Sequence, residues 1–124
     1  MIFLDTHVVI WLYAGHVKKL STAVIEQIEN NELCISQVVR LELQYLFEIG
    51  RLTVTPEVII KDLKKSIGLK VSAMQVEHVF DQAMVYAWTR DVFDRLITAE
   101  AEAAGLVLIT KDQKIRENYV QAFW

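Results

Sequence analysis

The sequence predicts a three-layer α/β fold, with a mostly parallel central sheet of four or five strands and helices on both faces. Short apolar runs without polar alternation recur along the chain, and helical segments separate them. Such runs are typical of strands that are buried on both faces of a parallel sheet. The chain has 124 residues and shows no linker-like or low-complexity stretch, so we expect a single domain over residues 1–124.

Five short segments are the expected strands. Each is apolar and is flanked by segments with helical character, and the run that contains Leu108 and Ile109 is the most clearly strand-like. The segments are residues 1–4, 33–35, 69–71, 106–109 and, as an edge strand, 123–124.

Residue types that begin and end helices mark several of the helices between these strands. Ser21 is a favourable N-cap, and residues 55–57 combine a cap, a proline at the first helical position and a first-turn acid. Ser72 and Gln75 have the spacing of a capping box. In chain order we expect helices over residues 7–14, 23–30, 38–49, 56–66, 73–87, 92–104 and, as a short helix within a polar turn, 111–119.

Composition excludes several classes of protein. Apolar residues make up 53% of the chain and charged residues 23%, which excludes a disordered or collagen-like chain. The single Cys34 excludes an internal disulfide framework and a cysteine-based zinc site. No apolar run is long enough to span a membrane, and Asp5 interrupts the apolar N-terminus, so we expect a cytoplasmic protein without a membrane partner. The net charge of −3 argues against a surface that binds nucleic acid over its whole extent, but it is compatible with a local site that does so through a metal ion.

Two acidic residues follow predicted strands. Asp5 comes directly after the first strand, and Asp112 follows the strand over 106–109. Because the carboxyl ends of parallel strands meet at one edge of the sheet, we expect these two side chains to lie close together. Each can also be the N-cap of the short helix that follows it.

Glu42 is an acid on an apolar helix face. Its neighbours at helical spacing include Val38, Tyr45, Leu46 and Ile49, which predicts that it lies on the core-facing side of the helix. No lysine or arginine stands at helical spacing to pair with it. Burial of an unpaired carboxylate is unfavourable, so it must meet a cation elsewhere in the fold or hold a proton. A carboxylate that reaches solvent at the rim of the core is the alternative.

Asp94 has a similar setting in the helix over 92–104. Its neighbours at helical spacing include Ile97 and Ala101, which again indicates a buried face, although Arg90 is close enough in sequence to pair with it. Asp91 stands three residues earlier, and it is more simply the N-cap of this helix.

Three to five carboxylates are therefore expected at one place in the fold, and this pattern favours metal-dependent phosphodiester cleavage. Like charges gather only around a counter-ion or a shared proton. Hard divalent cations prefer oxygen ligands, and Mg²⁺ is typically held by a few carboxylates together with water and substrate phosphate. Metal ions in such sites activate water and stabilise the leaving oxygen of a phosphodiester.

The same residues resemble a known family. Asp5-Thr6-His7 after a strand, the segment 36–42 that opens a helix, the block RDVFDRLI over 90–97 and the block LITKD over 108–112 occur in the order of a PIN domain of the small VapC type. The Asp-x-Phe-Asp-Arg-Leu block is the most specific of these elements. The family often has proline where this chain has Val92, and valine can adopt the same geometry at a helix start.

The resemblance implies a parallel sheet with an acidic pocket and an Mg²⁺- or Mn²⁺-dependent ribonuclease, often the toxin of a type II toxin–antitoxin pair. An RNA substrate and a cognate antitoxin are the partners that it implies. Carried over residue by residue, the catalytic and metal-binding acids are Asp5, Glu42, Asp94 and Asp112, with Asp91 as a fifth metal ligand.

Other polar residues lie near these acids in sequence. The hydroxyls of Thr6 and Thr110 can orient a carboxylate or cap a helix. Nearby cations are candidates for phosphate contacts, although exposed helix faces have the same composition. These candidate RNA-binding cations are Arg40, Arg90, Arg95, Lys111, Lys114 and Arg116. The histidines show no ligand spacing, and Trp11 is expected in the core or in an interface rather than against a nucleobase.

Apolar residues in the N-terminal half exceed what one sheet can cover. Leu43 and Phe47 lie off the apolar stripe that contains Glu42, so the helix over 38–49 has a wide apolar face. We expect a homodimer and a groove for the antitoxin at this surface, unless these residues form a second face of the core.

Two other classes of protein compete with a nuclease. A receiver-type phosphoacceptor domain has a similar length and sheet, but it needs an aspartate near the end of a middle strand, and residues 52–55 contain none. A catalytically silent interaction domain on the same fold is the second alternative, and it gives no reason for acids on apolar faces.

Overall fold

The computed structural model describes all 124 residues, and its centre is a sheet of five parallel strands in the order β3–β2–β1–β4–β5. The strands are β1 (Ile2–Leu4), β2 (Leu33–Ile35), β3 (Lys70–Val71), β4 (Leu108–Ile109) and β5 (Ala122–Phe123). In the register, Phe3 of β1 pairs with Cys34 of β2 on one side and with Leu108 of β4 on the other. The predicted parallel sheet is confirmed, including the edge strand near the end of the chain.

The helices connect these strands in the predicted order. They are α1 (Thr6–Ala14), α2 (Thr22–Asn30), α3 (Gln37–Glu48), α4 (Pro56–Ile67), α5 (Val76–Met84), α6 (Val92–Ala104) and α7 (Gln113–Asn118). A single 3₁₀ turn over Val17–Lys19, which the sequence did not predict, joins α1 to α2. The side chain of Ser21 accepts a hydrogen bond from the Val24 amide and is the predicted N-cap of α2.

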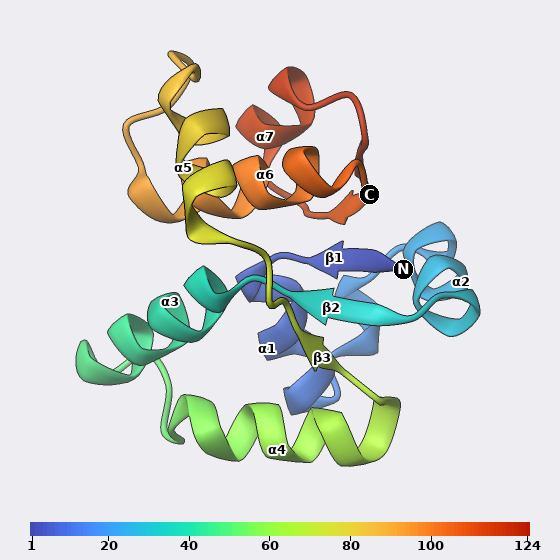
Figure 1. Cartoon of the computed structure of the whole chain (residues 1–124). Helices are drawn as coiled ribbons and strands as arrows, with labels where there is room; N and C mark the ends of the chain where they lie inside the picture. Colours follow the sequence, from blue (N-terminus) through green and yellow to red (C-terminus); the bar gives the residue numbers. More distant parts are fainter.

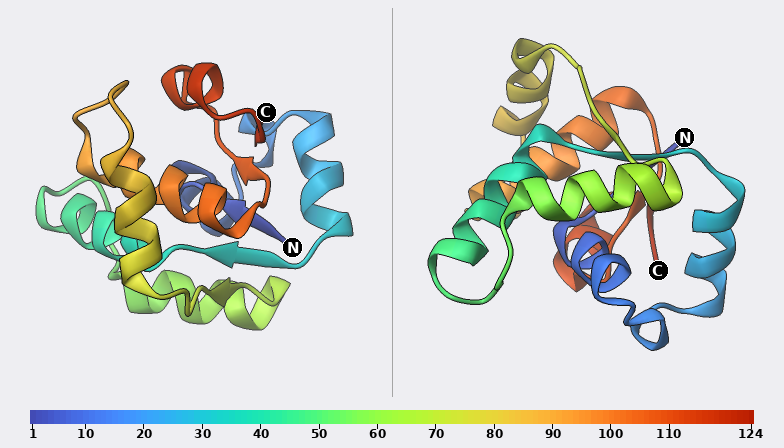
Figure 2. Two further views of the ribbon diagram at one scale, coloured as in Figure 1. Left: turned by 45° about the horizontal axis from the view of Figure 1, so that its top comes forward. Right: turned by 90° about the horizontal axis from the view of Figure 1, so that it is seen from below.

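Three layers result from this arrangement. Helices α1 and α4 lie on one side of the sheet and α5 and α6 on the other (Figure 1), and α4 crosses in front of the strands when the molecule is viewed from below (Figure 2). The arrowheads of β1 and β2 point toward α3, which places that helix at the carboxyl ends of the strands. The strands and the inner faces of the helices enclose one large apolar core, and a smaller cluster lies between α5 and α6.

The buried face of α3 differs from the predicted one. Val39, Leu43 and Leu46 are its buried residues, whereas Tyr45 and Ile49 are about half exposed. The prediction that Leu43 is surplus to the core is therefore wrong. Glu42 lies at the edge of the buried face rather than at its centre, and this position turns its carboxylate toward the ends of the strands.

The start of α5 also differs from the prediction. Gln75 is the N-cap and makes no capping hydrogen bond, while the Ser72 hydroxyl accepts from the amide of Met74, so the predicted capping box does not form. The helix ends at Met84, three residues before the predicted end. At this end the guanidinium of Arg95 donates to the carbonyl of Ala83, in the last turn of α5, at 2.9 Å and to the carbonyl of Tyr86 just beyond it. Carbonyls at a helix C-terminus lack the amide partners of a continuing helix, and Arg95 supplies donors to them.

None of the seven α-helices has the length and apolar character required to span a membrane.

Candidate active site

Two strands end in aspartates that each cap the following helix. Asp5 follows β1, and its Oδ1 accepts a hydrogen bond of 2.7 Å from the amide of Thr6 at the start of α1. Asp112 follows β4, and its Oδ1 accepts a hydrogen bond of 2.9 Å from the amide of Ile115 in α7. Asp5 and Asp112 thus each stand at the end of a strand and also cap a helix, two roles that the sequence left as alternatives.

Thr110 connects these two aspartates. Its hydroxyl donates a hydrogen bond of 2.6 Å to Oδ2 of Asp5 and accepts one of 3.1 Å from the backbone amide of Asp112. The Thr110 side chain is fully buried, so no solvent competes for these bonds. Both oxygens of Asp5 are therefore fixed, one by Thr6 and the other by Thr110.

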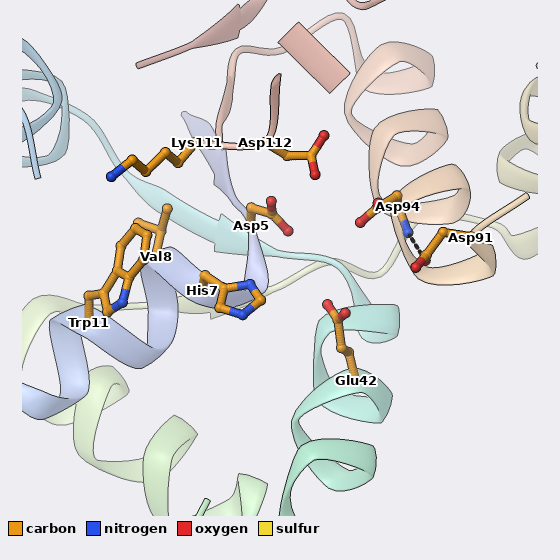
Figure 3. A pocket seen from close by; sticks show the side chains of 9 residues that line it. All are labelled: Asp5, His7, Val8, Trp11, Glu42, Asp91, Asp94, Lys111 and Asp112. Atoms are coloured by element: carbon orange, nitrogen blue, oxygen red, sulfur yellow. Dashed lines mark hydrogen bonds between the residues drawn. The ribbon is translucent and has the colours of Figure 1, made fainter. Parts of the chain in front are cut away.

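Three further carboxylates face these aspartates from two helices. Glu42 extends from α3, and Asp91 and Asp94 stand at the start of α6 (Figure 3). Oδ1 of Asp91 accepts a hydrogen bond of 3.0 Å from the amide of Asp94, so Asp91 is the N-cap of α6 as predicted.

These groups line one pocket of about 370 Å³. All five acids of the predicted site border it, and His7, Val8, Trp11 and Lys111 complete its wall (Figure 3). Acids that are distant in sequence thus meet because β1, α3, α6 and the loop after β4 converge at the carboxyl ends of the central strands.

Burial and mutual repulsion shape the electrostatics of this pocket. Burial raises the pKa of Asp5, and the hydrogen bonds from Thr110 and Thr6 offset part of that rise. Burial, with a smaller contribution from the charges of Asp5 and Asp91, raises the pKa of Glu42 to about 7. The Thr6 hydroxyl faces Glu42 and lowers this value somewhat, although no well-formed hydrogen bond joins the two side chains.

Asp94 has the same environment. Burial comes first among the causes, followed by the negative charges of the other four pocket acids, and together they raise the pKa of Asp94 to about 7. At neutral pH the pocket without a counter-ion therefore holds part of its carboxyl groups in the protonated form.

The donor set fits a hard divalent cation. No carboxylate of the pocket forms an ion pair, since the single salt bridge of the structure joins Lys70 to Glu32 at 3.1 Å. Thr6 Oγ1 is a buried oxygen without a hydrogen-bond partner next to Asp5. No three acidic, histidine or cysteine side chains form a closed cluster of ligands. Divalent cations such as Mg²⁺ do not require a closed set, because they usually take one or two carboxylates and complete their shell with water and phosphate oxygen.

Of the six predicted cations, Lys111 alone borders the pocket. Arg40 donates to the side chain of Gln37 at 2.7 Å, and Arg90 donates to the carbonyl of Ala87 at 3.2 Å. Arg95 donates to the carbonyls of Ala83 and Tyr86 at the C-terminal end of α5. The remaining two, Lys114 and Arg116, are exposed on α7 and do not line the pocket.

The sequence reasoning missed His7 and Trp11 as wall residues. Their spacing of four residues places them on the same face of α1, one turn apart, and α1 begins at the pocket. A helix that begins at a site presents one face of its first two turns to that site, and this signal could have identified both residues.

Comparisons with known proteins agree with the fold. The family model described as PIN domain matches residues 2–120 of the chain. Ribonuclease VapC22 of Mycobacterium tuberculosis is 29% identical over 125 residues, covering 94% of this chain and 91% of the relative. Among solved structures, VapBC2 from Rickettsia felis bound to a DNA fragment from its promoter has a TM-score of 0.64 at 20% identity, covering 94% of this chain and 92% of that chain. DNA-bound VapBC from Salmonella typhimurium has a TM-score of 0.62 at 22% identity, covering 98% and 95%.

Proposed function

The chain belongs to the PIN domain family, and on this basis we propose that it is a metal-dependent endoribonuclease that acts as the toxin of a type II toxin–antitoxin pair. The observation that carries the proposal is the pocket in which five carboxylates from four segments meet without an ion-pair partner. The similarity to a protein named as a ribonuclease supports RNA as the substrate.

We propose that Asp5, Glu42, Asp94 and Asp112 are the catalytic acids and that these four, with Asp91, hold Mg²⁺ or Mn²⁺. When bound, such an ion would supply Lewis-acid stabilisation of the phosphoryl oxygens and lower the pKa of the attacking water. The raised pKa values of Glu42 and Asp94 support this assignment, because carboxyl groups that repel one another gain most from a cation.

The chain itself orients the acids. Thr110 fixes the carboxylate of Asp5 and the backbone at Asp112 together, so it is a positioning residue for two of the acids. Asp91 and Asp112 each commit one oxygen to a helix amide, which sets the direction of the other oxygen. Without a metal ion the carboxyl groups of Glu42 and Asp94 have pKa values near 7, so a divalent cation that binds there at neutral pH would displace protons.

We propose a cognate antitoxin and a second copy of the chain as protein partners in the cytoplasm. The two similar solved structures are of VapBC proteins, which supports a partner of the antitoxin type. Leu41, Tyr45 and Ile49 form an exposed apolar edge of α3, and Phe80, Met84 and Val92 form another beside α5 and α6. Exposed apolar side chains that are grouped in this way support a protein interface at these edges.

A cleavage assay tests the nuclease function directly. Purified protein is incubated with a mixture of single-stranded RNAs in Mg²⁺, in Mn²⁺ and in EDTA. Cleavage is expected with either ion and none in EDTA, and Asp5→Asn should remove it while the circular dichroism spectrum stays unchanged. Equal rates in EDTA and Mg²⁺, or no cleavage under any condition by a folded protein, would overturn the proposal, and the latter result would favour the silent interaction domain.

A further inference from the structure

An aromatic and cationic cluster stands at one end of the acidic pocket. The rings of Trp11, in α1, and Trp124, which follows β5, meet edge to face with their centroids 5.8 Å apart. The ammonium group of Lys111 lies 5.9 Å from the Trp11 ring and 5.8 Å from the Trp124 ring, and that of Lys19 lies 5.6 Å from the Trp11 ring. We refer to these four residues as the Trp–Lys cluster.

The cluster is continuous with the pocket. Trp11 and Lys111 belong to both, and in Figure 3 they lie on the opposite side of Asp5 from Asp91 and Asp94. The His7 ring stands 6.1 Å from the Trp11 ring, inclined by 49°, and it also lines the pocket. Aromatic rings therefore lead from the C-terminal edge of the molecule to the carboxylates.

The charges of this region are arranged asymmetrically. Five acids repel phosphate at one end of the pocket, whereas Lys111 is the single lysine or arginine that borders it. Neither Lys19 nor Lys111 forms a salt bridge, even though Lys111 shares the pocket with five acids. Both lysine side chains are exposed. The cations of this cluster are consequently available to phosphate groups. The tryptophan rings beside them pack against the core on one side and are partly exposed.

We propose that the Trp–Lys cluster is a subsite for a nucleotide of single-stranded RNA next to the phosphate that reacts, an inference that rests on the proposed ribonuclease function. A base stacks on the indole of Trp11 or Trp124 in place of a lysine ammonium, and the displaced lysine binds an adjacent phosphate. Stacking of this kind accepts any base, because every base has a π-face. It requires an unpaired base, since a base in an A-form helix is already stacked on its neighbours.

Binding measured without cleavage tests the subsite separately from the nuclease function. A fluorescein-labelled 8-nucleotide RNA is titrated with protein in EDTA, where the proposed enzyme does not cleave. Trp11→Leu and Trp124→Leu should weaken binding about 5- to 150-fold, the range found when an aromatic partner is removed from a stacked base. Trp11→Phe should recover most of the affinity, and Phe80→Leu, an exposed aromatic on α5, is the matched control and should bind as the wild type does.

The salt dependence of RNA binding tests whether Lys111 and Lys19 contact phosphate groups. Each phosphate contact contributes about 0.7 to the slope of log affinity against log salt for single strands. Lys111→Gln and Lys19→Gln should each reduce this slope by about 0.7, whereas the control Lys61→Gln on α4 should leave it unchanged.

A change in the RNA makes the test independent of variant folding. An abasic nucleotide moved along the 8-mer should weaken binding to the wild-type protein at one or two positions only, and at those positions Trp11→Leu should add little further loss. Equal affinity of the intact and all abasic RNAs, or of Trp11→Leu and Phe80→Leu, would overturn the subsite. Retained RNA affinity with loss of antitoxin binding in the tryptophan variants would overturn it as well and assign the cluster to a protein contact.

If wild-type protein cleaves RNA in Mg²⁺ while the abasic scan is flat, this inference fails and the ribonuclease function stands. Absence of cleavage would instead refute the proposed function, whatever the titration gives.

Discussion

The Asp94→Asn variant should be more stable than the wild-type protein at pH 8 in the absence of divalent ions. Burial, followed by the negative charges of four other pocket acids, raises the pKa of Asp94 from 3.8 to about 7. Asparagine has nearly the shape of a protonated aspartic acid, so the substitution keeps the packing and removes a charge that the folded state accepts poorly.

The sign of the pH dependence follows from the direction of this shift. A carboxyl group with a higher pKa in the folded state keeps its proton there when the unfolded chain has already lost it. The free energy of unfolding of the wild type therefore falls as pH rises from about 4 to about 7 and is low above that range. Asp94→Asn has no carboxyl group at this position and lacks this pH-dependent loss of stability. Its free energy of unfolding should therefore equal that of the wild type near pH 4 and exceed it by the full amount near pH 8.

The gain in stability expected for Asp94→Asn has an upper bound, and two effects reduce it. The interval from 3.8 to about 7 corresponds to about 4 kcal/mol, at about 1.4 kcal/mol per pKa unit. Asp94 is only partly buried, and solvent screening reduces the expected gain to about 1–2 kcal/mol. Loss of an acid from the first turn of α6 opposes the gain by about 0.3–1 kcal/mol. We expect a net increase of about 1 kcal/mol in the free energy of unfolding at pH 8.

Urea unfolding in EDTA at pH 4.5, 6, 7 and 8.5 measures this difference. Asp62→Asn is the matched control, because Asp62 is exposed on α4, and it should stay within about 0.5 kcal/mol of the wild type at every pH. In saturating Mg²⁺ the order should reverse, since an ion at 100 times its dissociation constant stabilises the folded wild type by about 2.7 kcal/mol. A variant that is no more stable than the wild type at pH 8.5 in EDTA, or a difference that does not change with pH, would refute the electrostatic account.

Three further substitutions test other parts of the structure. Thr110→Val leaves one oxygen of Asp5 buried without its donor, so we expect a loss of about 1–3 kcal/mol in urea unfolding and a large fall in cleavage, both recovered by Thr110→Ser. Arg95→Met removes the side-chain donor to the carbonyls of Ala83 and Tyr86 at the C-terminal end of α5. It should lower the free energy of unfolding by about 1–3 kcal/mol, with faster hydrogen exchange in α5; unchanged exchange there would contradict the assignment. Leu43→Ala should cost about 2–5 kcal/mol as a core truncation, whereas Leu41→Ala, 61% exposed on the same helix, should stay within about 0.5 kcal/mol of the wild type; equal effects would mean that the buried face of α3 is assigned incorrectly.

The order of strands and helices and the meeting of the acids could be predicted from sequence because they depend on local signals. Apolar runs, helix caps and the rule that parallel strands end at one edge brought Asp5 and Asp112 together. Helical periodicity placed Glu42 and Asp94 near the core, and the structure turns both toward the pocket.

The face of α3 could not be predicted, because the helix is apolar on more than one side. At 3.6 residues per turn its apolar residues span about two thirds of its circumference, so periodicity alone does not select the buried stripe. These residues are Val38, Val39, Leu41, Leu43, Tyr45, Leu46 and Phe47. Packing against α6, α4 and α1 makes the selection. The same limit applies to Arg95: its sequence position beside Asp94 suggested phosphate, whereas the early end of α5 supplies it with carbonyl acceptors.

The helix caps explain how the fold accommodates so many acids in one pocket. Asp5, Asp91 and Asp112 each accept a hydrogen bond from a backbone amide at the start of α1, α6 or α7. Three helices thus direct their positive N-terminal ends toward these carboxylates, and each such end stabilises a negative charge by about 0.3–1 kcal/mol. Glu42 and Asp94 cap no helix, and they are the two acids whose pKa is raised to about 7. Burial raises the pKa of Asp5 as well, despite its cap and the bond from Thr110. The helix ends therefore offset part of the cost of three charges, and Asp5, Glu42 and Asp94 are the acids for which a divalent ion or a proton is needed.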